Sequence, residues 1–398
     1  MEEKIRIIVD EFEKFATFNK EAKPVLSARQ GQFGKKDSYK LNQMLGYKKN
    51  IQAPNYTMDQ YILIDLLFSL ALDGRLYVRA SNETGKPALV ETGVMKSFRT
   101  LNQHEKYIYF LQTYWTKYHF DEKFSQWFSV SSFYYFLDLI AQADNGQKIT
   151  KHAHPSIYRL YCKDAALLHH LKFFGLGELE EIEGAKGKYE DSIETFIPND
   201  FGIQLSGFLL TEAAMLWSCK DLFLFLSKET RHESEFTENP FAVFKAVFPD
   251  GIVQRTVDSD VEFDRYGVYT FKVSLSKNCW RKINVSHRHS LHDLHMAIQE
   301  AFDFGNDHLY AFYIGGNRRT GKPIYCSNAE TDEPTADETK IEDMGLYKGQ
   351  KLYYLFDFGD EWNFDVVLLQ IDKHSPLPVK PVIVESKGES PKQYNYWQ

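Results

Sequence analysis

The sequence predicts an α+β protein, with a helical N-terminal region followed by a mostly antiparallel α+β domain. A change of pattern along the chain supports this prediction. Up to about residue 226, apolar residues recur at the spacing of helix faces, whereas from about residue 253 most apolar residues alternate with polar ones, as in strands. The chain has 398 residues, a length typical of about two or three domains.

The first 120 residues have the element order of a winged helix. The predicted elements are helices over 3–18, 36–45 and 57–72, followed by strands over 76–81 and 88–93. The third helix ends at the stop signal Asp73-Gly74. We therefore predict a helical, winged-helix-like domain over residues 1–120.

The same order recurs weakly in a second helical region, residues 121–227. From residue 101 onward, helices are expected over 107–118, 124–143, 162–175 and 208–226, and strands over 177–182 and 191–197. A second winged unit is predicted here. Residues 228–240 are polar without a clear period, so residues 228–250 are predicted to be a linker before a domain at 251–398.

The charge of the chain is uneven. Its net charge of −8 excludes a uniformly basic nucleic-acid-binding protein, yet residues 20–60 carry eight basic side chains against three acidic ones. A helix that enters a DNA groove needs such groups to neutralise phosphates. The candidate nucleic-acid-binding residues in this segment are Lys35, Lys36, Lys40, Lys48 and Lys49. Winged helices that make only protein contacts are the alternative, so the expected partner is DNA or a protein.

Three features favour a cytoplasmic protein that does not enter a membrane. The four cysteines are far apart and form no CxxC pair, as expected for reduced thiols. The N-terminus has acidic residues where a signal peptide needs a positive start. The most apolar segment, 208–226, contains Glu212, Lys220 and Asp221.

The C-terminal segment, residues 251–398, combines strands with one long helix. Strands are expected over 269–275, 280–285, 309–314, 351–357 and 362–370, with a helix over 291–302 and a short turn over 341–344. Ser290 is placed to cap the helix. Residues 358–361 form a tight turn between the last two strands, which makes them a hairpin. Hairpins of this kind give a mostly antiparallel sheet.

This segment resembles the plasmid pRiA4b ORF-3-like family over nearly its full length. Six motifs stand in the family's order: YTFKVSL at 269–275, WRKI at 280–283, LHDLHMAIQEAF at 291–302, HLYAF at 308–312, the hairpin ending in DFGDEW at 357–362, and GESPKQY at 388–394. Asn395 stands where the family usually has proline. The resemblance implies an occurrence on plasmids and beside mobile elements, and hence a DNA-associated role, but no particular reaction.

The densest cluster of polar side chains lies in the same segment. Its members are His287, His289, His292, His295, His308, Asp357 and Asp360. His292 and His295 share a helix face and, with Asp357, are candidate ligands for Zn²⁺ or Mn²⁺. The candidate catalytic residues are His295, His308, Asp357 and Asp360, since a histidine beside a carboxylate serves as a general base. The structural alternative is that the histidines are buried and hydrogen-bonded and that the Asp pair caps the hairpin turn.

A basic loop at 316–323 matches the phosphate-binding P-loop motif at all but its last position. Pro323 stands where that motif requires Ser or Thr to bind Mg²⁺, so a nucleotide site is not predicted. Arg318 and Arg319 remain candidate contacts to phosphate or to an acidic partner.

These observations favour a binding or accessory protein associated with DNA, plasmids or mobile elements. A metal-assisted hydrolase or nuclease that uses the His and Asp cluster is the alternative, and a structural scaffold is a third hypothesis. The sequence leaves open whether the chain is an enzyme. No cofactor is expected.

Overall fold

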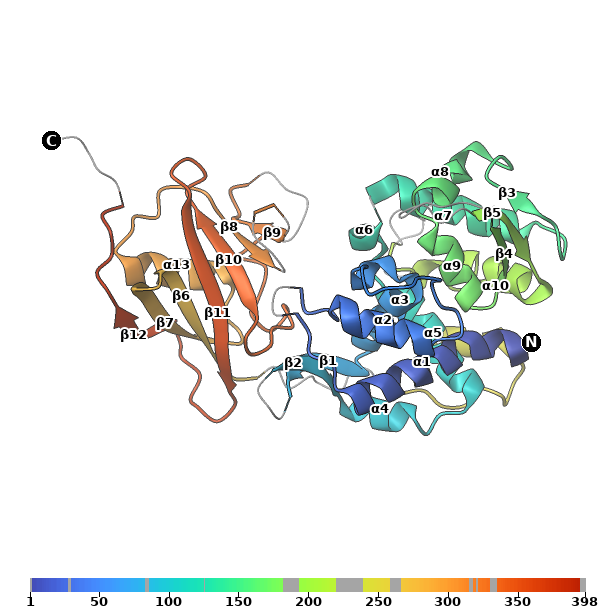
Figure 1. The fold of residues 1–398 in the computed structure, drawn as a ribbon, viewed down its shortest axis with the longest axis horizontal. Helices are drawn as coiled ribbons and strands as arrows, with labels where there is room; N and C mark the ends of the chain where they lie inside the picture. Colours follow the sequence, from blue (N-terminus) through green and yellow to red (C-terminus); the bar gives the residue numbers. More distant parts are fainter. Residues whose placement is uncertain are drawn as a thin grey trace. The chain divides into compact units, whose positions relative to one another are not determined.

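The computed structural model describes residues 2–27, 30–82, 86–124, 126–181, 193–219, 239–257, 266–314, 318–319, 321–329 and 335–393. Its chain divides into two compact units, which are coloured along the sequence in Figure 1. The first unit contains residues 1–23, 35–77 and 91–261, and the second contains residues 24–34, 78–90 and 262–398.

The chain up to residue 247 is mostly helical. Its described helices are α1 (Glu2–Ala22), α2 (Lys35–Met44), α3 (Ile62–Asp73), α4 (Gly93–Phe98), α5 (Gln103–Lys117), α6 (Phe120–Lys123), α7 (Gln126–Ala141), α8 (Tyr158–Cys162), α9 (Ala166–Phe173), α10 (Asp200–Leu210) and α12 (Pro240–Phe244). The 3-10 helices are η1 (Met58–Gln60), η2 (Pro155–Ile157), η3 (Ala214–Leu216) and η5 (Lys245–Val247). The strands are β1 (Tyr77–Ser81), β2 (Pro87–Glu91), β3 (Ile149–Thr150), β4 (Gly177–Glu181) and β5 (Ile193–Pro198).

The first helix, α1, forms because apolar residues recur along one of its faces. The side chains that predicted this helix, Ile5, Ile8, Phe12 and Phe15, are all buried. α1 packs against α5, and the ring of Phe12 lies 4.6 Å from that of Phe110 between centroids. The predicted helix is therefore confirmed, and it supplies part of an aromatic core.

The third helix, α3, is shorter than predicted and deeply buried. Thr57 and Gln60 form a capping box around η1, and Tyr61 then leaves the helical conformation, so α3 begins at Ile62 and not at residue 57. The eight consecutive or nearly consecutive buried residues of α3 are Leu63, Ile64, Leu66, Leu67, Phe68, Ser69, Leu70 and Ala71. α3 packs against α1, α2, α5 and α9, which explains why it is apolar all round.

A small antiparallel sheet has the strand order β3-β5-β4, with β3 between α7 and α8 in the chain and β4 and β5 after α9. The helix predicted over 208–226 was placed too late. Asn199 caps α10 through a hydrogen bond from the Gly202 amide, and the helix ends at Leu210 with Thr211 as its C-cap. Residues 220–226 lie outside the described part of the chain.

Residues 239–257 also hold defined structure. Asn239 caps α12 with Pro240 in its first turn, and the rings of Phe244 and Phe248 are buried. Farther along, the Glu105 carboxylate of α5 accepts hydrogen bonds from the amides of Gln254 and Arg255. These contacts hold residues 239–255 on the first unit.

The C-terminal part of the chain is an α+β domain built on a seven-stranded antiparallel sheet. Its elements are β6 (Val268–Ser276), β7 (Cys279–Ser286), α13 (Leu291–Phe302), β8 (Tyr310–Ile314), β9 (Lys322–Tyr325), β10 (Lys351–Phe356), β11 (Trp362–Asp372) and β12 (Val382–Lys387). The strand order is β12-β7-β6-β11-β10-β8-β9, and each neighbouring pair is antiparallel. This sheet and the helical region before it confirm the predicted α+β class, with a helical N-terminal region and a mostly antiparallel C-terminal domain.

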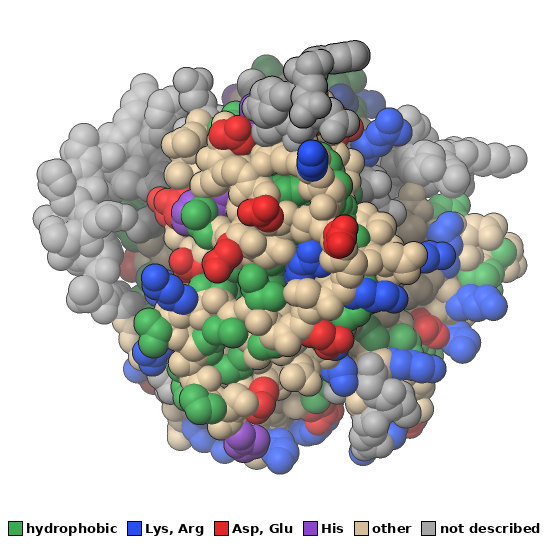
Figure 2. Space-filling view, turned by 90° about the vertical axis from the view of Figure 1, so that its left-hand side faces the viewer, with side chains coloured by type: hydrophobic (Ala, Val, Ile, Leu, Met, Phe, Trp, Pro, Cys, Tyr) green, Lys and Arg blue, Asp and Glu red, His purple; other side chains and the backbone are tan. Residues whose placement is uncertain are grey.

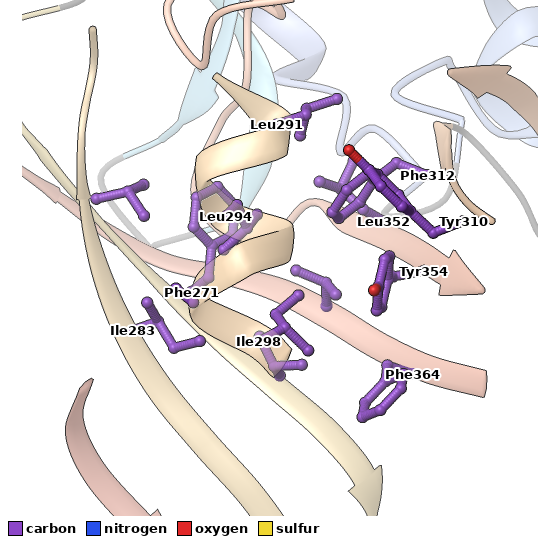
Figure 3. Close-up of a cluster of buried hydrophobic side chains, with 14 of the residues drawn as sticks. Phe271, Ile283, Leu291, Leu294, Ile298, Tyr310, Phe312, Leu352, Tyr354 and Phe364 are labelled. Carbon is purple, nitrogen blue, oxygen red and sulfur yellow. The ribbon is translucent and has the colours of Figure 1, made fainter. Parts of the chain in front are cut away.

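One face of the sheet is covered by α13, which has the predicted bounds. Ser290 and Asp293 form the capping box that starts the helix. Figure 3 shows Leu294 and Ile298 of α13 directed at Phe271, Ile283 and other side chains of the sheet. This core fixes the helix next to β8 and so positions the residues described below.

No described helix is long and apolar enough to span a bilayer.

Candidate functional site

A polar pocket of about 280 Å³ lies beside α13 and the start of β8. Its lining comes from α13, from the loop that leads into β8, and from the chain after β9. The lining residues are His292, Asn306, Asp307, His308, Leu309, Tyr310, Cys326, Ser327 and Asn328. Three separate segments therefore converge on the pocket, and two of the histidines singled out in the sequence line it.

His292 is paired with a tyrosine in this pocket. Its Nδ1 lies 2.8 Å from the hydroxyl oxygen of Tyr310. Burial, with smaller contributions from Cys326, Asp337 and Asp293, raises the pKa of Tyr310. The phenol therefore keeps its proton at neutral pH, and its hydroxyl shares one hydrogen bond with Nδ1 of His292.

His295 is fully buried behind the pocket. Its Nε2 donates to Oδ1 of Asn306 at 2.8 Å, and its Nδ1 accepts from the hydroxyl of Tyr354 at 2.6 Å. The ring also stacks on Tyr310 with 3.6 Å between centroids. Burial lowers the pKa of His295 to about 3, so the ring is neutral. Because both nitrogens are bonded inside the domain, these contacts favour the structural alternative for His295.

His308 and Asp357 meet at the edge of the pocket. Nε2 of His308 lies 3.6 Å from Oδ2 of Asp357. The other oxygen of Asp357 accepts from the backbone amides of Gly359 at 2.8 Å and Asp360 at 3.2 Å, which caps the turn between β10 and β11. Asp360 thus contributes a backbone N–H to the turn, while its side chain is exposed.

The predicted metal ligands do not form a coordination site. In the described ranges, no three His, Cys, Asp or Glu side chains are grouped to hold a metal ion. The rings of His292 and His295 lie 5.7 Å apart on one helix face, but the hydrogen bonds of His295 use both of its nitrogens. His287 and His289 also have local partners. Nδ1 of His287 accepts from the amide of Gly267, and Nδ1 of His289 accepts from the amide of Ser286.

The sheet, the helix and the loop around this pocket match a known family. The family model described as plasmid pRiA4b ORF-3-like protein covers residues 267–393. Residues 267–393 are a pRiA4b ORF-3-like domain. A crystal structure of a protein of unknown function, MM3350 from Methanosarcina mazei Go1, is similar at 28% identity over 31% of this chain and 71% of that chain, with a TM-score of 0.26. No curated protein matches the chain.

The last motif of the ORF-3-like domain shapes the pocket. The side-chain amide of Gln393 donates to the carbonyl oxygen of Gly305 at 3.1 Å and to the carboxylate of Asp307 at 3.3 Å, and its oxygen accepts from the Gly305 amide. The buried Arg281 holds the same tail through the carbonyl oxygen of Gly388, at 3.1 Å. The C-terminal tail therefore fixes the loop that carries Asn306 to Leu309.

The predicted nucleic-acid-binding lysines lie in α2 and in the segment that follows it, and most of them are exposed. Lys35, Lys36, Lys40 and Lys48 are exposed, and Lys49 is half-buried with its Nζ 3.3 Å from the carbonyl oxygen of Gln60. Lys36 and Lys40 are four residues apart and share a helix face. These side chains form what we call the α2 basic surface, consisting of Lys35, Lys36, Lys40 and Lys48.

The two predicted arginines belong to the ORF-3-like domain. Arg318 forms an ion pair with Glu361, and its guanidinium lies 5.7 Å from the centre of the Phe358 ring. Arg319 is exposed. Figure 2 shows acidic and basic side chains intermixed on the drawn face of this domain, without an extended area of one sign.

Sequence reasoning missed several residues of the pocket. Tyr310 lies inside the HLYAF motif, but its strand is buried at four consecutive positions, so alternation did not mark it as a pocket residue. Cys326 carried no signal, because its role depends on β9, a strand that was not predicted. Asn306 and Asp307 lie in a loop whose position depends on the tail.

Proposed function

We propose that this protein is a DNA-associated binding protein that contacts the phosphate backbone of duplex DNA through the α2 basic surface without reading the base sequence. The observation that carries this proposal is the set of exposed lysines on and after α2. Four basic side chains on one short segment provide the electrostatic attraction that dominates non-specific DNA binding.

Winged units in the N-terminal region are part of the proposal. The chain runs through helices α7, α8 and α9 and through strands whose order in the sheet is β3-β5-β4. A helix-turn-helix followed by a strand hairpin is the plan of a winged helix. The order α1, α2, α3, β1, β2 repeats this plan in the first part of the chain. These element orders support two winged units.

We propose no contact with the DNA bases because the third helix of each unit is buried. In a helix-turn-helix protein the second helix of the motif enters the major groove. The corresponding helices here are α3 and α9, and they pack against each other. Leu67 and Leu171 are among their buried side chains. Every residue of α3 and α9 is buried or half-buried, so neither helix presents an exposed face to a groove, and α2 is the better candidate for contact with DNA.

The salt dependence of duplex binding tests the proposal. Four neutralised phosphates predict that log K falls with log salt with a slope of about −3.6. Replacing Lys35, Lys36, Lys40 and Lys48 together by Gln should abolish most of this slope. Fluorescence anisotropy with a labelled duplex, titrated at several salt concentrations, measures both quantities.

A matched variant controls for net charge. Replacing four exposed lysines of the ORF-3-like domain removes the same charge, and these are Lys351, Lys380, Lys387 and Lys392. We expect this variant to keep the wild-type slope. Binding that is insensitive to salt, or an equal loss in the two variants, would refute the proposal. Duplexes of unrelated sequence should bind with similar affinity.

The alternative of a metal-assisted hydrolase or nuclease has weaker support. His295 bonds through both ring nitrogens, and one oxygen of Asp357 caps a turn. His308 is the remaining catalytic candidate that lines the pocket, and its carboxylate neighbours are Asp307 and Asp357. The geometry therefore favours binding over catalysis at this cluster.

A further inference from the structure

We propose that the pocket of the ORF-3-like domain binds an organic cation, namely an ammonium or guanidinium group of the size of a lysine or arginine side chain. This site is separate from the α2 basic surface and would give the protein a second ligand of opposite charge to DNA. The charge, the hydrogen-bonding groups and the size of the pocket favour such a ligand.

The charge of the lining favours a cation. Among the described lining residues Asp307 carries a formal negative charge, and none is Lys or Arg. A second carboxylate, Asp357, lies 3.6 Å from His308 at the edge. A third, Asp337, has its pKa lowered by a hydrogen bond from Thr335 and, to a smaller extent, by Ser327 and His292 of the lining. An anion in this pocket would meet the carboxylate of Asp307, and the basic side chains of the described lining are the imidazoles of His292 and His308.

The polar groups of the lining suit a donor-rich ligand. The side chains of Asp307, Ser327 and Asn328 offer oxygen acceptors from two different segments. Ammonium carries three N–H donors and guanidinium carries five, and neither accepts hydrogen bonds. Acceptors placed around a pocket can therefore satisfy such a group, and the pairing with a carboxylate strengthens the bond.

The size of the pocket limits the ligand. Drug-sized ligands occupy clefts of roughly 300–1,000 Å³. At about 280 Å³ this pocket is smaller, so it fits one side chain or a short free amine and not a nucleotide. The clamp that Gln393 places on Gly305 and Asp307 keeps the loop of the pocket in position before any ligand arrives.

Cys326 makes the proposal testable without knowledge of the natural ligand. This thiol lines the pocket and is 5% exposed. A ligand in the pocket covers it and slows its reaction with a small alkylating reagent. Peptide mass spectrometry reads Cys326 separately from Cys162, Cys219 and Cys279, which serve as internal references.

The experiment compares ligands of matched length and different charge on the full-length protein. Agmatine supplies a guanidinium and an ammonium, N-butylurea is neutral, and glutarate is anionic. We expect agmatine to slow iodoacetamide labelling of Cys326 at least several-fold, and the other two to have no effect. Titration calorimetry with the same three compounds gives an independent readout that needs no labelling. Equal effects of glutarate and agmatine, or heat and protection from none of the three, overturn the proposal.

Two substitutions locate the binding site. Asp307→Asn removes the carboxylate while keeping the shape, and it should weaken agmatine binding about tenfold or more. Asp365→Asn removes an exposed carboxylate of β11 and should leave binding unchanged. Equal affinity in Asp307→Asn and the wild type contradicts the assignment. Neither substitution touches the α2 basic surface, so this result is independent of DNA binding.

A further comparison separates two sources of the cation. A capped tripeptide with a central arginine presents the group as part of a partner protein, whereas agmatine presents it as a free small molecule. Tighter binding of the peptide identifies a partner's side chain as the ligand, and tighter binding of agmatine identifies a free amine. Both outcomes support the cation site and differ only in its source.

Discussion

His295 illustrates how one residue can look functional in the sequence and serve the core in the fold. It stands in a family motif and near other histidines in the sequence. In the structure it connects α13 to β10 through the hydroxyl of Tyr354 and to the pocket loop through Asn306. This buried neutral imidazole uses both nitrogens to connect three segments of the domain. A structural role therefore accounts for His295 without a catalytic one.

The buried state of His295 predicts a pH dependence of stability. Its pKa in the folded chain is about 3, below the ordinary value of 6.5. The unfolded chain therefore binds a proton between these values and the folded chain does not, so stability is full above pH 6.5 and falls on acidification. Each pH unit below 6.5 costs about 1.4 kcal/mol of the free energy of unfolding.

The variant His295→Gln separates this contribution from other titrating groups. The variant is less stable at neutral pH, but its urea midpoint should fall less steeply from pH 6.5 to pH 4.5 than that of the wild type. Parallel pH profiles for the two proteins would show that His295 does not titrate as described.

At the residue scale, the sequence could identify the candidate histidines, but it could not tell which of them are structural and which face the pocket. His292, His295 and His308 have similar sequence contexts. Their roles differ because His295 faces the core, His292 faces the pocket and His308 lies at the edge. Which face of α13 is covered depends on the sheet, and which atoms remain for a ligand depends on partners such as Asn306 and Tyr354. Such contacts join residues far apart in sequence.

Among the elements, α10 shows how closely two segments of backbone can approach. A Cβ on Gly202 would lie 1.8 Å from the carbonyl oxygen of Leu176, whereas a Cβ on Gly207 of the same helix would meet no atom within 4 Å. Gly202→Ala should therefore destabilise the first unit by about 2–3 kcal/mol through overpacking. Gly207→Ala should stabilise it by up to about 1 kcal/mol, because alanine is the better helix former.

Thermal unfolding of the two variants measures this contrast. The two substitutions are chemically identical and lie on one helix, so helix propensity alone predicts the same sign for both. Opposite shifts of the melting temperature are expected from the packing. Equal shifts would mean that the backbone near Leu176 moves away at little cost.

The elements that the sequence missed are those with weak local signals. β9 contains Pro323 and has only four residues. β12 follows Pro381 and pairs with β7 alone, so it is a mostly exposed edge strand without clear alternation of buried residues. By contrast, α13 has a cap, an apolar face and a clear end, and its bounds were predicted without error. Local chemistry fixes such a helix, whereas edge strands depend on a neighbour elsewhere in the chain.

On the scale of the whole molecule, Glu105 links distant parts of the chain. This buried carboxylate accepts hydrogen bonds from the amides of Asn102, Gln254 and Arg255, and the guanidinium of Arg255 lies 3.1 Å away. Burial by itself would raise the pKa of Glu105, but these hydrogen bonds together lower it below 4.5. The clamp is therefore present at neutral pH and weakens as the pH falls below about 4.5 and through the folded-state pKa.

Limited proteolysis tests the clamp. Glu105→Gln should release residues 252–257 and increase thermolysin cleavage near Val253 about tenfold at neutral pH. Glu13→Gln breaks a part-buried ion pair between α1 and Lys106 of α5 and leaves the hydrogen bonds of Glu105 in place, so cleavage near Val253 should change little. Unchanged cleavage in Glu105→Gln would show that other contacts suffice to hold this segment.

The change from a helical region to an antiparallel domain was predictable, because apolar residues repeat at helix spacing in the first part of the chain and alternate as in strands in the second. The family motifs identify the second part. The packing of α3 on α9 was not predictable, since two apolar helices about a hundred residues apart carry no mark of being partners. The long apolar run of α3 did indicate burial, but not what covers it.

That packing also bears on how the chain can be divided. A fragment ending at residue 120 would keep α3 and lose α9, leaving leucine and isoleucine side chains in water. Such a surface drives self-association, so the shortened polypeptide should precipitate or require detergent. The solubility of the helical region therefore depends on having α3 and α9 in the same polypeptide.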